Sequence, residues 1–140
     1  MAFTGNFSCN VFKTGLMNGT FNFTSGTFYI ALYTNDATLD ASTTAYTATG
    51  EVVASGYSAG GLALTIAQAP TVGTGSTAYI SFDNAAWTSA LTARGALIYQ
   101  SGGGNPAVCV LDFGADKTST ATFTVQFPAV SNTSAIIRIA

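Results

Sequence analysis

The sequence predicts an all-β protein, a jelly-roll-like sandwich of two antiparallel sheets with one short helix near the N-terminus. Seven runs of β-branched and aromatic residues are bounded by Gly, Pro, Asn or Asp, as is typical of short strands. No helical pattern separates these runs, which favours a sandwich or barrel over a parallel sheet. Within residues 120–127, apolar side chains alternate strictly with Thr and Gln, as in a sheet with one face in water. A chain of 140 residues fits one domain, so we expect residues 1–140 to form a single unit.

The helix is expected at about residues 7–17. Phe7, Val11, Phe12 and Leu16 are spaced so that they fall on one helical stripe. Gly19 follows, and glycine adopts the left-handed conformation that commonly ends a helix.

The strands are expected at residues 27–34, 62–67, 77–82, 93–100, 107–113, 120–127 and 135–140. Three glycines at 102–104 lie between the fourth and fifth of these runs. A phosphate-binding loop would need a helix after its glycines, whereas a strand pattern follows here. These glycines therefore predict a hairpin turn.

Residues 36–61 form a long segment of small polar residues, interrupted by larger side chains that include Leu39, Tyr46 and Tyr57. Loops of this length are usually functional or disordered. The recurring apolar side chains argue against disorder. We expect an ordered arm that packs on its own sheet or on a neighbouring chain.

The composition excludes several classes of partner. The chain has four basic and six acidic residues, no histidine, and 48% hydrophobic residues. The basic residues are scattered singly, so they form no patch for nucleic acid. No run of about 18 apolar residues occurs and the N-terminus lacks a signal-peptide pattern, so we expect neither a membrane span nor secretion by that route. A low net charge favours association with other chains.

No arrangement of residues predicts an enzyme, a cofactor or a metal site. Without histidine, a serine or cysteine nucleophile lacks its usual base. The sequence Asp-Phe-Gly at 112–114 lacks the other motifs of a kinase, so Asp112 is expected to open a turn. The possible carboxylate pairs, Asp36 with Asp40 and Asp112 with Asp116, lie in segments rich in Thr, Asn and Gly, where aspartate is typical of turns.

Cys9 and Cys109 are expected as buried thiols rather than as a disulfide, because the chain shows no export signal. Trp87 and the six tyrosines could form a platform on which sugars stack, or they could belong to the core. Most of them lie in or beside apolar runs, which favours the core.

Several stretches resemble, in the same order along the chain, a family of virion proteins of short-tailed bacteriophages, and within it the capsid cement or decoration proteins. These stretches are FYIALYTNDATLDASTTAY, GEVVASGYSAGG, ARGALIYQ, VCVLDFG, FTVQFP and AIIRIA. In that family the cement protein is a jelly-roll protein that clamps neighbouring major capsid subunits and has no catalytic motif. The resemblance therefore implies a structural protein of the capsid exterior, assembled in the host cytoplasm, with the major capsid protein as its partner. A tail or fibre component, or a carbohydrate-binding β-sandwich module, is the alternative.

Two segments are expected to reach a neighbouring chain, namely the N-terminal segment and the arm at 36–61. The candidate interface residues are Phe3, Phe7, Phe12, Leu39, Tyr46 and Tyr57. Self-association is also expected. A homodimer is favoured because closed two-fold symmetry is the commonest arrangement of identical chains, and a trimer is the runner-up.

Overall fold

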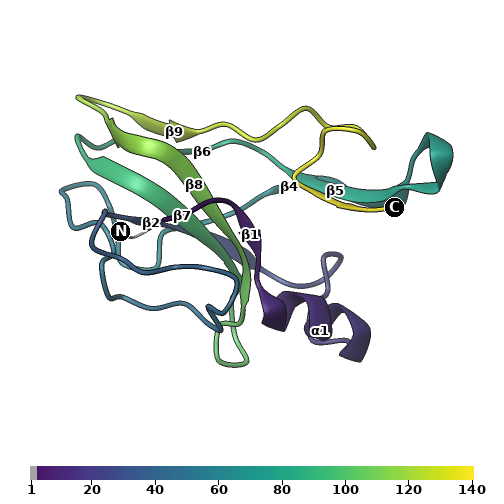
Figure 1. Cartoon of the computed structure of the whole chain (residues 1–140). Helices are drawn as coiled ribbons and strands as arrows, with labels where there is room; N and C mark the ends of the chain where they lie inside the picture. Colours follow the sequence, from purple (N-terminus) through teal and green to yellow (C-terminus); the bar gives the residue numbers. More distant parts are fainter. Residues whose placement is uncertain (1–2) are drawn as a thin grey trace.

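The computed structural model describes residues 3–140, and these residues form ten β-strands and one α-helix (Figure 1). The strands build three antiparallel sheets of five, three and two strands. The five-stranded sheet is one layer of the fold, and the two smaller sheets make up the other. The predicted all-β sandwich with a short N-terminal helix is confirmed.

The five-stranded sheet has the strand order β1-β8-β7-β2-β3. Its strands are β1 (Phe7–Ser8), β8 (Ala107–Thr118), β7 (Thr92–Gln100), β2 (Phe28–Tyr33) and β3 (Leu62–Ala63). The middle strands β2 and β7 are buried on both faces, which explains their nearly continuous apolar sequences. β7 and β8 form a hairpin, and Gly102, Gly103 and Gly104 in its turn all have positive φ, so the predicted hairpin turn is confirmed.

The second layer combines the two smaller sheets. The three-stranded sheet consists of β10 (Ile137–Ile139), β5 (Ala78–Phe82) and β4 (Ile66–Val72), and the two-stranded sheet consists of β6 (Ala85–Trp87) and β9 (Phe123–Val125). β4 and β5 are joined through a short 3-10 turn, η1 (Thr74–Ser76). In Figure 1 the three-stranded sheet extends to the right, away from the five-stranded sheet and on the same side of the molecule as the helix.

The helix α1 spans Asn10–Asn18, so the predicted range 7–17 begins too early. Phe7 belongs to β1, where it pairs with Val110 of β8. The chain cannot form the helix until it leaves this pairing after Ser8. The predicted end is confirmed, because Gly19 has φ of 82° and its N–H donates to Gly15 O.

Four predicted strands differ from the observed ones by more than one residue at an end, and β6 was not predicted. The run 135–140 pairs as a strand only over Ile137–Ile139. The run 62–67 is divided between two strands of different sheets. Leu62–Ala63 form β3 at the edge of the five-stranded sheet, and Ile66 begins β4 of the three-stranded sheet. The run 107–113 continues to Thr118, and only Phe123–Val125 of the run 120–127 pairs as a strand.

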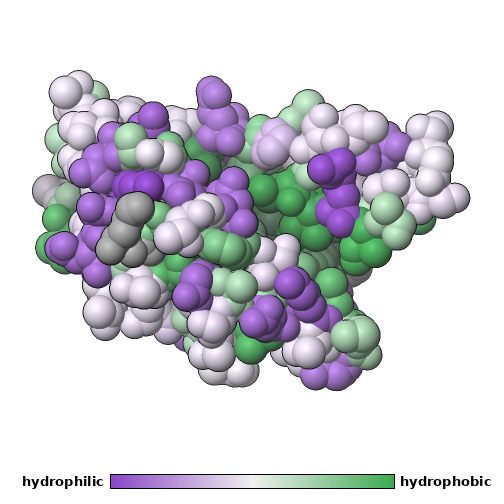
Figure 2. All heavy atoms as spheres, viewed as in Figure 1, coloured by the Kyte–Doolittle hydropathy of each residue, from purple (hydrophilic) through white to green (hydrophobic). Residues whose placement is uncertain are grey.

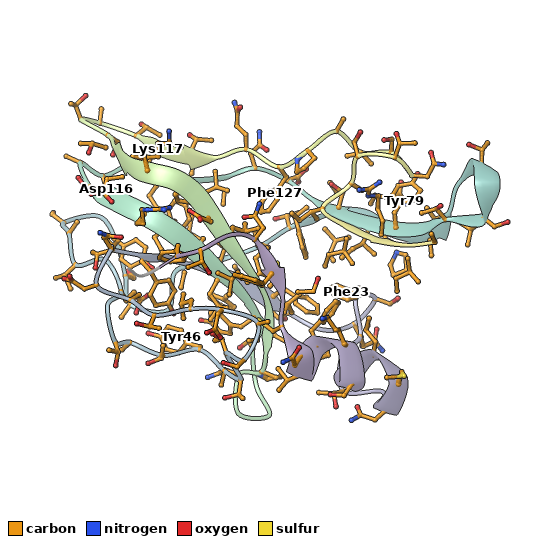
Figure 3. The ribbon with its side chains drawn as sticks, in the orientation of Figure 1. Phe23, Tyr46, Tyr79, Asp116, Lys117 and Phe127 are labelled. Carbon is orange, nitrogen blue, oxygen red and sulfur yellow. The ribbon has the colours of Figure 1, made fainter. Side chains whose placement is uncertain are left out.

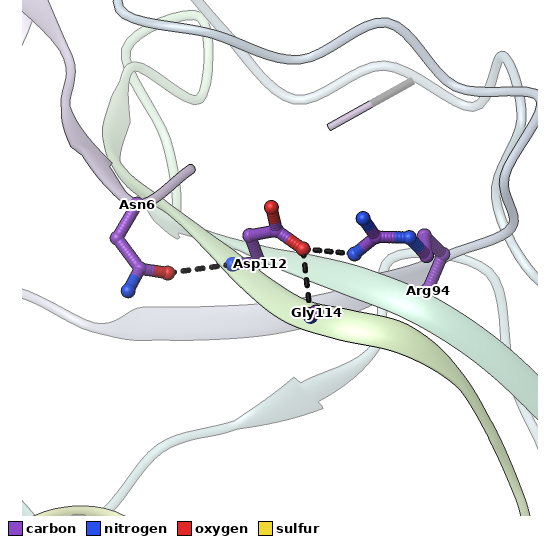
Figure 4. Close-up of polar contacts among 4 residues, drawn as sticks. All are labelled: Asn6, Arg94, Asp112 and Gly114. Carbon is purple, nitrogen blue, oxygen red and sulfur yellow. Dashed lines mark hydrogen bonds and ion pairs between the residues drawn. The ribbon is translucent and has the colours of Figure 1, made fainter. Parts of the chain in front are cut away.

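Asp112 lies within β8 and does not open a turn, which corrects the expectation for the Asp-Phe-Gly sequence. Its carboxylate accepts hydrogen bonds from Arg94 Nη1 and from Gly114 N (Figure 4). Gly114 has φ of 81°, and the pairing of β8 with β7 shifts register between the Gly95–Asp112 and Ala93–Lys117 pairs. The local bend is therefore a β-bulge that leaves the strand intact.

The core joins the two layers through aromatic side chains. Phe82 of β5 lies between Phe28 of the five-stranded sheet and Phe127, with ring centroids 6.1 and 5.8 Å away. Trp87 is 3% exposed and contacts Tyr57, so its predicted place in the core is confirmed. Cys9 and Cys109 are both free and buried.

The arm at 36–61 is folded against its own chain. Val52 N donates to Leu32 O of β2, and Tyr46 N donates to Asn105 O in the β7–β8 turn. Tyr33 and Glu51 form an isolated antiparallel bridge. Of the two expected arrangements, the structure shows the arm packed on its own sheet.

Candidate interaction surface

Four of the six predicted interface residues are buried within the protein itself. Phe3 is 1% exposed, Phe12 4%, Leu39 2% and Tyr57 9%. These side chains fill the core where the N-terminal segment and the arm cross the sheets, so they are not free to contact a neighbour in this conformation. An interface at these four positions would require the N-terminal segment or the arm to leave the fold. Phe7 and Tyr46 are half-buried and also pack against the core.

The N-terminal segment is held on the five-stranded sheet. Asn6 Oδ1 accepts a hydrogen bond of 2.7 Å from Asp112 N (Figure 4). The guanidinium carbon Cζ of Arg94 lies over the ring of Phe3, 5.7 Å from the ring centroid. The same guanidinium is paired with Asp112. From residue 3 onward this segment is therefore part of the fold and not a free arm. Residues 1 and 2 lie outside the described residues.

A buried carboxylate, which the sequence analysis did not single out, organises the arm. Glu51 is 8% exposed, and its oxygens accept hydrogen bonds from Tyr46 Oη at 2.6 Å, Tyr57 Oη at 2.7 Å and Gly60 N at 2.7 Å. Tyr57 Oη in turn accepts a bond from Leu32 N of β2. Burial, followed by the hydrogen bond to Glu51, raises the pKa of Tyr46 to about 12, so the phenol stays protonated and donates. Figure 3 marks Tyr46 among the loops of the arm.

Of the four aspartates expected in turns, Asp36 and Asp40 lie in a turn and a bend, whereas Asp112 and Asp116 lie in β8. Asp40 accepts hydrogen bonds from the hydroxyl and the N–H of Ser42, and these lower the pKa of its carboxyl, as for a turn residue. For Asp112, burial acts to raise the pKa, but the bonds from Gly114 and Arg94 outweigh it and the pKa is lowered.

Within residues 3–140, no three His, Cys, Asp or Glu side chains are grouped as metal ligands would be. The same residues include no helix with the length and apolar character needed to cross a membrane.

An apolar groove lies between α1 and the three-stranded sheet, and we call it the docking groove. One part, about 170 Å³ in volume, is lined by Leu16, Phe23, Pro70, Tyr79, Ile137 and Ile139, among others. The adjoining part is larger, about 560 Å³, and shares Phe12, Leu16, Ile137 and Ile139 with it. Figure 2 shows hydrophobic residues in a hollow between the helix and the projecting sheet, and Figure 3 places Phe23 and Tyr79 on opposite sides of it.

Exposed apolar side chains gather on the elements that form this groove. Met17 at the end of α1 is 83% exposed, Val72 at the end of β4 is 65% exposed, and Ile139 in β10 is 54% exposed. Of these three residues, Ile139 lines the groove itself. Single exposed hydrophobic residues are ordinary, but one that is exposed within an apolar hollow is typical of an interaction site.

Every charged side chain that lines the docking groove is basic. Lys13 of α1 and Arg138 of β10 line its larger part, and no Asp or Glu side chain lines either part. The chain as a whole has a formal net charge of −2, so the groove differs in sign from the molecule around it. These residues are far apart in the sequence, and no sequence pattern joins them.

In comparisons with known proteins, no family model, curated protein or solved structure matches the chain.

Proposed function

We propose that this chain is a structural protein of a bacteriophage virion, a capsid cement or decoration protein that binds and clamps neighbouring major capsid protein subunits and stabilises the head. The proposal starts from the resemblance of the sequence to that family. The structural observation that supports it most is the docking groove, an apolar hollow with exposed Met17, Val72 and Ile139 on the elements around it. In this proposal the protein lies on the capsid exterior.

The physical properties of the chain suit repeated weak contacts. A protein present in many copies on a shell gains affinity when several contacts form at once, so each contact can be weak. With four basic and six acidic residues, few charges would need to be desolvated at such contacts, and repulsion between adjacent copies is small. Clamping requires more than one attachment, which is why we include self-association in the proposal, as a homodimer with a trimer as the alternative.

The carbohydrate-binding alternative receives less support. A stacking platform needs aromatic faces at the surface. Trp87, Tyr33, Tyr57 and Tyr99 are all buried, and their rings are used inside the fold.

The experiment uses particles of the phage that encodes the chain, prepared without this protein, to which purified protein is added back. We expect the protein to sediment with the shells and to raise the temperature at which they release DNA. Cryo-electron microscopy of the reconstituted particles should place the chain between capsid subunits. If density for this chain is found on the tail or on fibres and none on the capsid, the protein is a tail or fibre component and not a cement protein.

A further inference from the structure

We propose that the docking groove binds a segment that inserts one large apolar side chain and carries a carboxylate next to it, and that this segment belongs to the shell protein and not to a second copy of this chain. The assignment to the shell protein rests on the proposed function. The chemistry of the segment follows from the groove itself.

The smaller part of the groove fits an apolar anchor. Its volume of about 170 Å³ is close to that of an apolar cavity of roughly 150 Å³ that holds a benzene-sized group. Its walls come from Leu16 of α1, Tyr79 of β5, and Ile137 and Ile139 of β10, and no charged side chain lines it. A polar group placed there would lose its water without gaining a partner. One aromatic or branched aliphatic side chain is the ligand that this part accepts, as at the centre of many protein interfaces.

The larger part of the groove supplies the charge. Lys13 and Arg138 line it and are both exposed, so their cationic groups are available to a ligand. Arg138 Nη1 donates to Thr133 O, which uses one of the five N–H donors of a guanidinium. No Asp or Glu side chain lines this part, so neither cation is neutralised within it. A carboxylate beside the apolar anchor is therefore complementary to this end of the groove.

A two-fold dimer of this chain centred on the groove is unfavourable. In a two-fold dimer the same patch faces itself. Lys13 and Arg138 of one copy would then lie opposite the same two cations of the other, and like charges across an interface are unfavourable. A two-fold dimer therefore uses another surface.

The test compares two variants in the groove with two matched variants outside it. Ile139→Asp and Lys13→Glu change exposed residues of the groove. Val53→Asp, at a position 97% exposed in the arm, and Lys117→Glu, at an exposed position in β8, make the same changes elsewhere. Thermal unfolding followed by circular dichroism verifies that all four remain folded. Binding is measured by sedimentation with shells that lack this protein, and self-association by analytical ultracentrifugation.

We expect Ile139→Asp to weaken shell binding about tenfold or more, because the new carboxylate enters an apolar site. Lys13→Glu should weaken binding and reduce its dependence on salt, whereas the two control variants bind like the wild type. If all four variants bind shells as tightly as the wild type, the groove assignment is overturned and the proposed cement function is unaffected. Equal losses for Lys13→Glu and Lys117→Glu would overturn the carboxylate. If Ile139→Asp converts an oligomer to monomers, the groove is a contact between copies of this chain and the assignment to the shell protein is overturned. If the wild type does not bind shells, both this inference and the proposed function are overturned.

Discussion

A buried carboxylate is costly unless its oxygens accept hydrogen bonds, and Glu51 meets that condition with three donors. The two tyrosines in this set come from the same arm, on either side of Glu51 in the sequence. Tyr57 also accepts the N–H of Leu32, so one phenol links the arm, the carboxylate and β2. The network explains why a segment of 26 residues with few strand pairings is ordered on the sheet.

Replacing Tyr57 with Phe should therefore lower the free energy of unfolding by about 1–3 kcal/mol, because it leaves the buried N–H of Leu32 without an acceptor and removes one donor to Glu51. Tyr46→Phe removes only the donor, at a half-buried site that water reaches, so we expect a smaller loss of about 0.5–1.5 kcal/mol. Urea unfolding of the two variants gives both values. Equal losses would show that the Leu32 bond adds nothing.

At the scale of elements, the N-terminal segment and the β7–β8 hairpin depend on one glycine. A Cβ at Gly95 would overlap the ring of Phe3 and the carbonyl oxygen of Leu111 in the neighbouring strand. The absence of a side chain is what allows Phe3 to lie against the sheet and contact Arg94.

Gly95→Ala should consequently destabilise the protein by about 1–3 kcal/mol, as other overpacked sites do, even though alanine normally suits a strand better than glycine. Because Phe3 must move, limited proteolysis should cut the N-terminal segment faster in this variant. Thr124→Ala, at an exposed position in β9, is the control and should change stability by less than about 0.5 kcal/mol. If Gly95→Ala matched this control in both assays, the close contact with Phe3 would be refuted.

Local pattern was enough to predict most of the strands, the hairpin turn at 102–104 and the Gly19 helix end, because each depends on neighbours in the sequence, whereas β1 and β6 were not predicted. Phe7 was assigned to the helix because its spacing fits, whereas pairing with Val110, about 100 residues away, decides its place in β1. The candidate interface residues were apolar side chains outside the predicted strands, and only the folded chain shows that most of them are core. The docking groove combines α1, β5 and β10, so its residues meet only after the sheets form.

At the scale of the whole molecule, the two layers share one core and the projecting sheet is attached through aromatic contacts. Phe82, near the end of β5, contacts Phe23, Phe28 and Phe127 and is 2% exposed. Phe23 also lines the docking groove, so the contacts that attach the sheet also set the position of one wall of that groove.

Phe82→Ala should lower the free energy of unfolding by about 3–5 kcal/mol, the usual cost of removing a buried phenylalanine. Because this ring attaches the three-stranded sheet, hydrogen exchange should increase most in β4, β5 and β10, while β7 and β8 keep their relative protection until global unfolding. Val53→Ala, at a position 97% exposed in the arm and outside the docking groove, is the control and should stay within about 0.5 kcal/mol of the wild type. The loosened sheet carries Tyr79, Ile137 and Ile139, so Phe82→Ala should also bind shells more weakly than Val53→Ala at a temperature where both are folded. Uniform exchange across both layers, with unchanged shell binding, would mean that the projecting sheet is held by contacts other than Phe82.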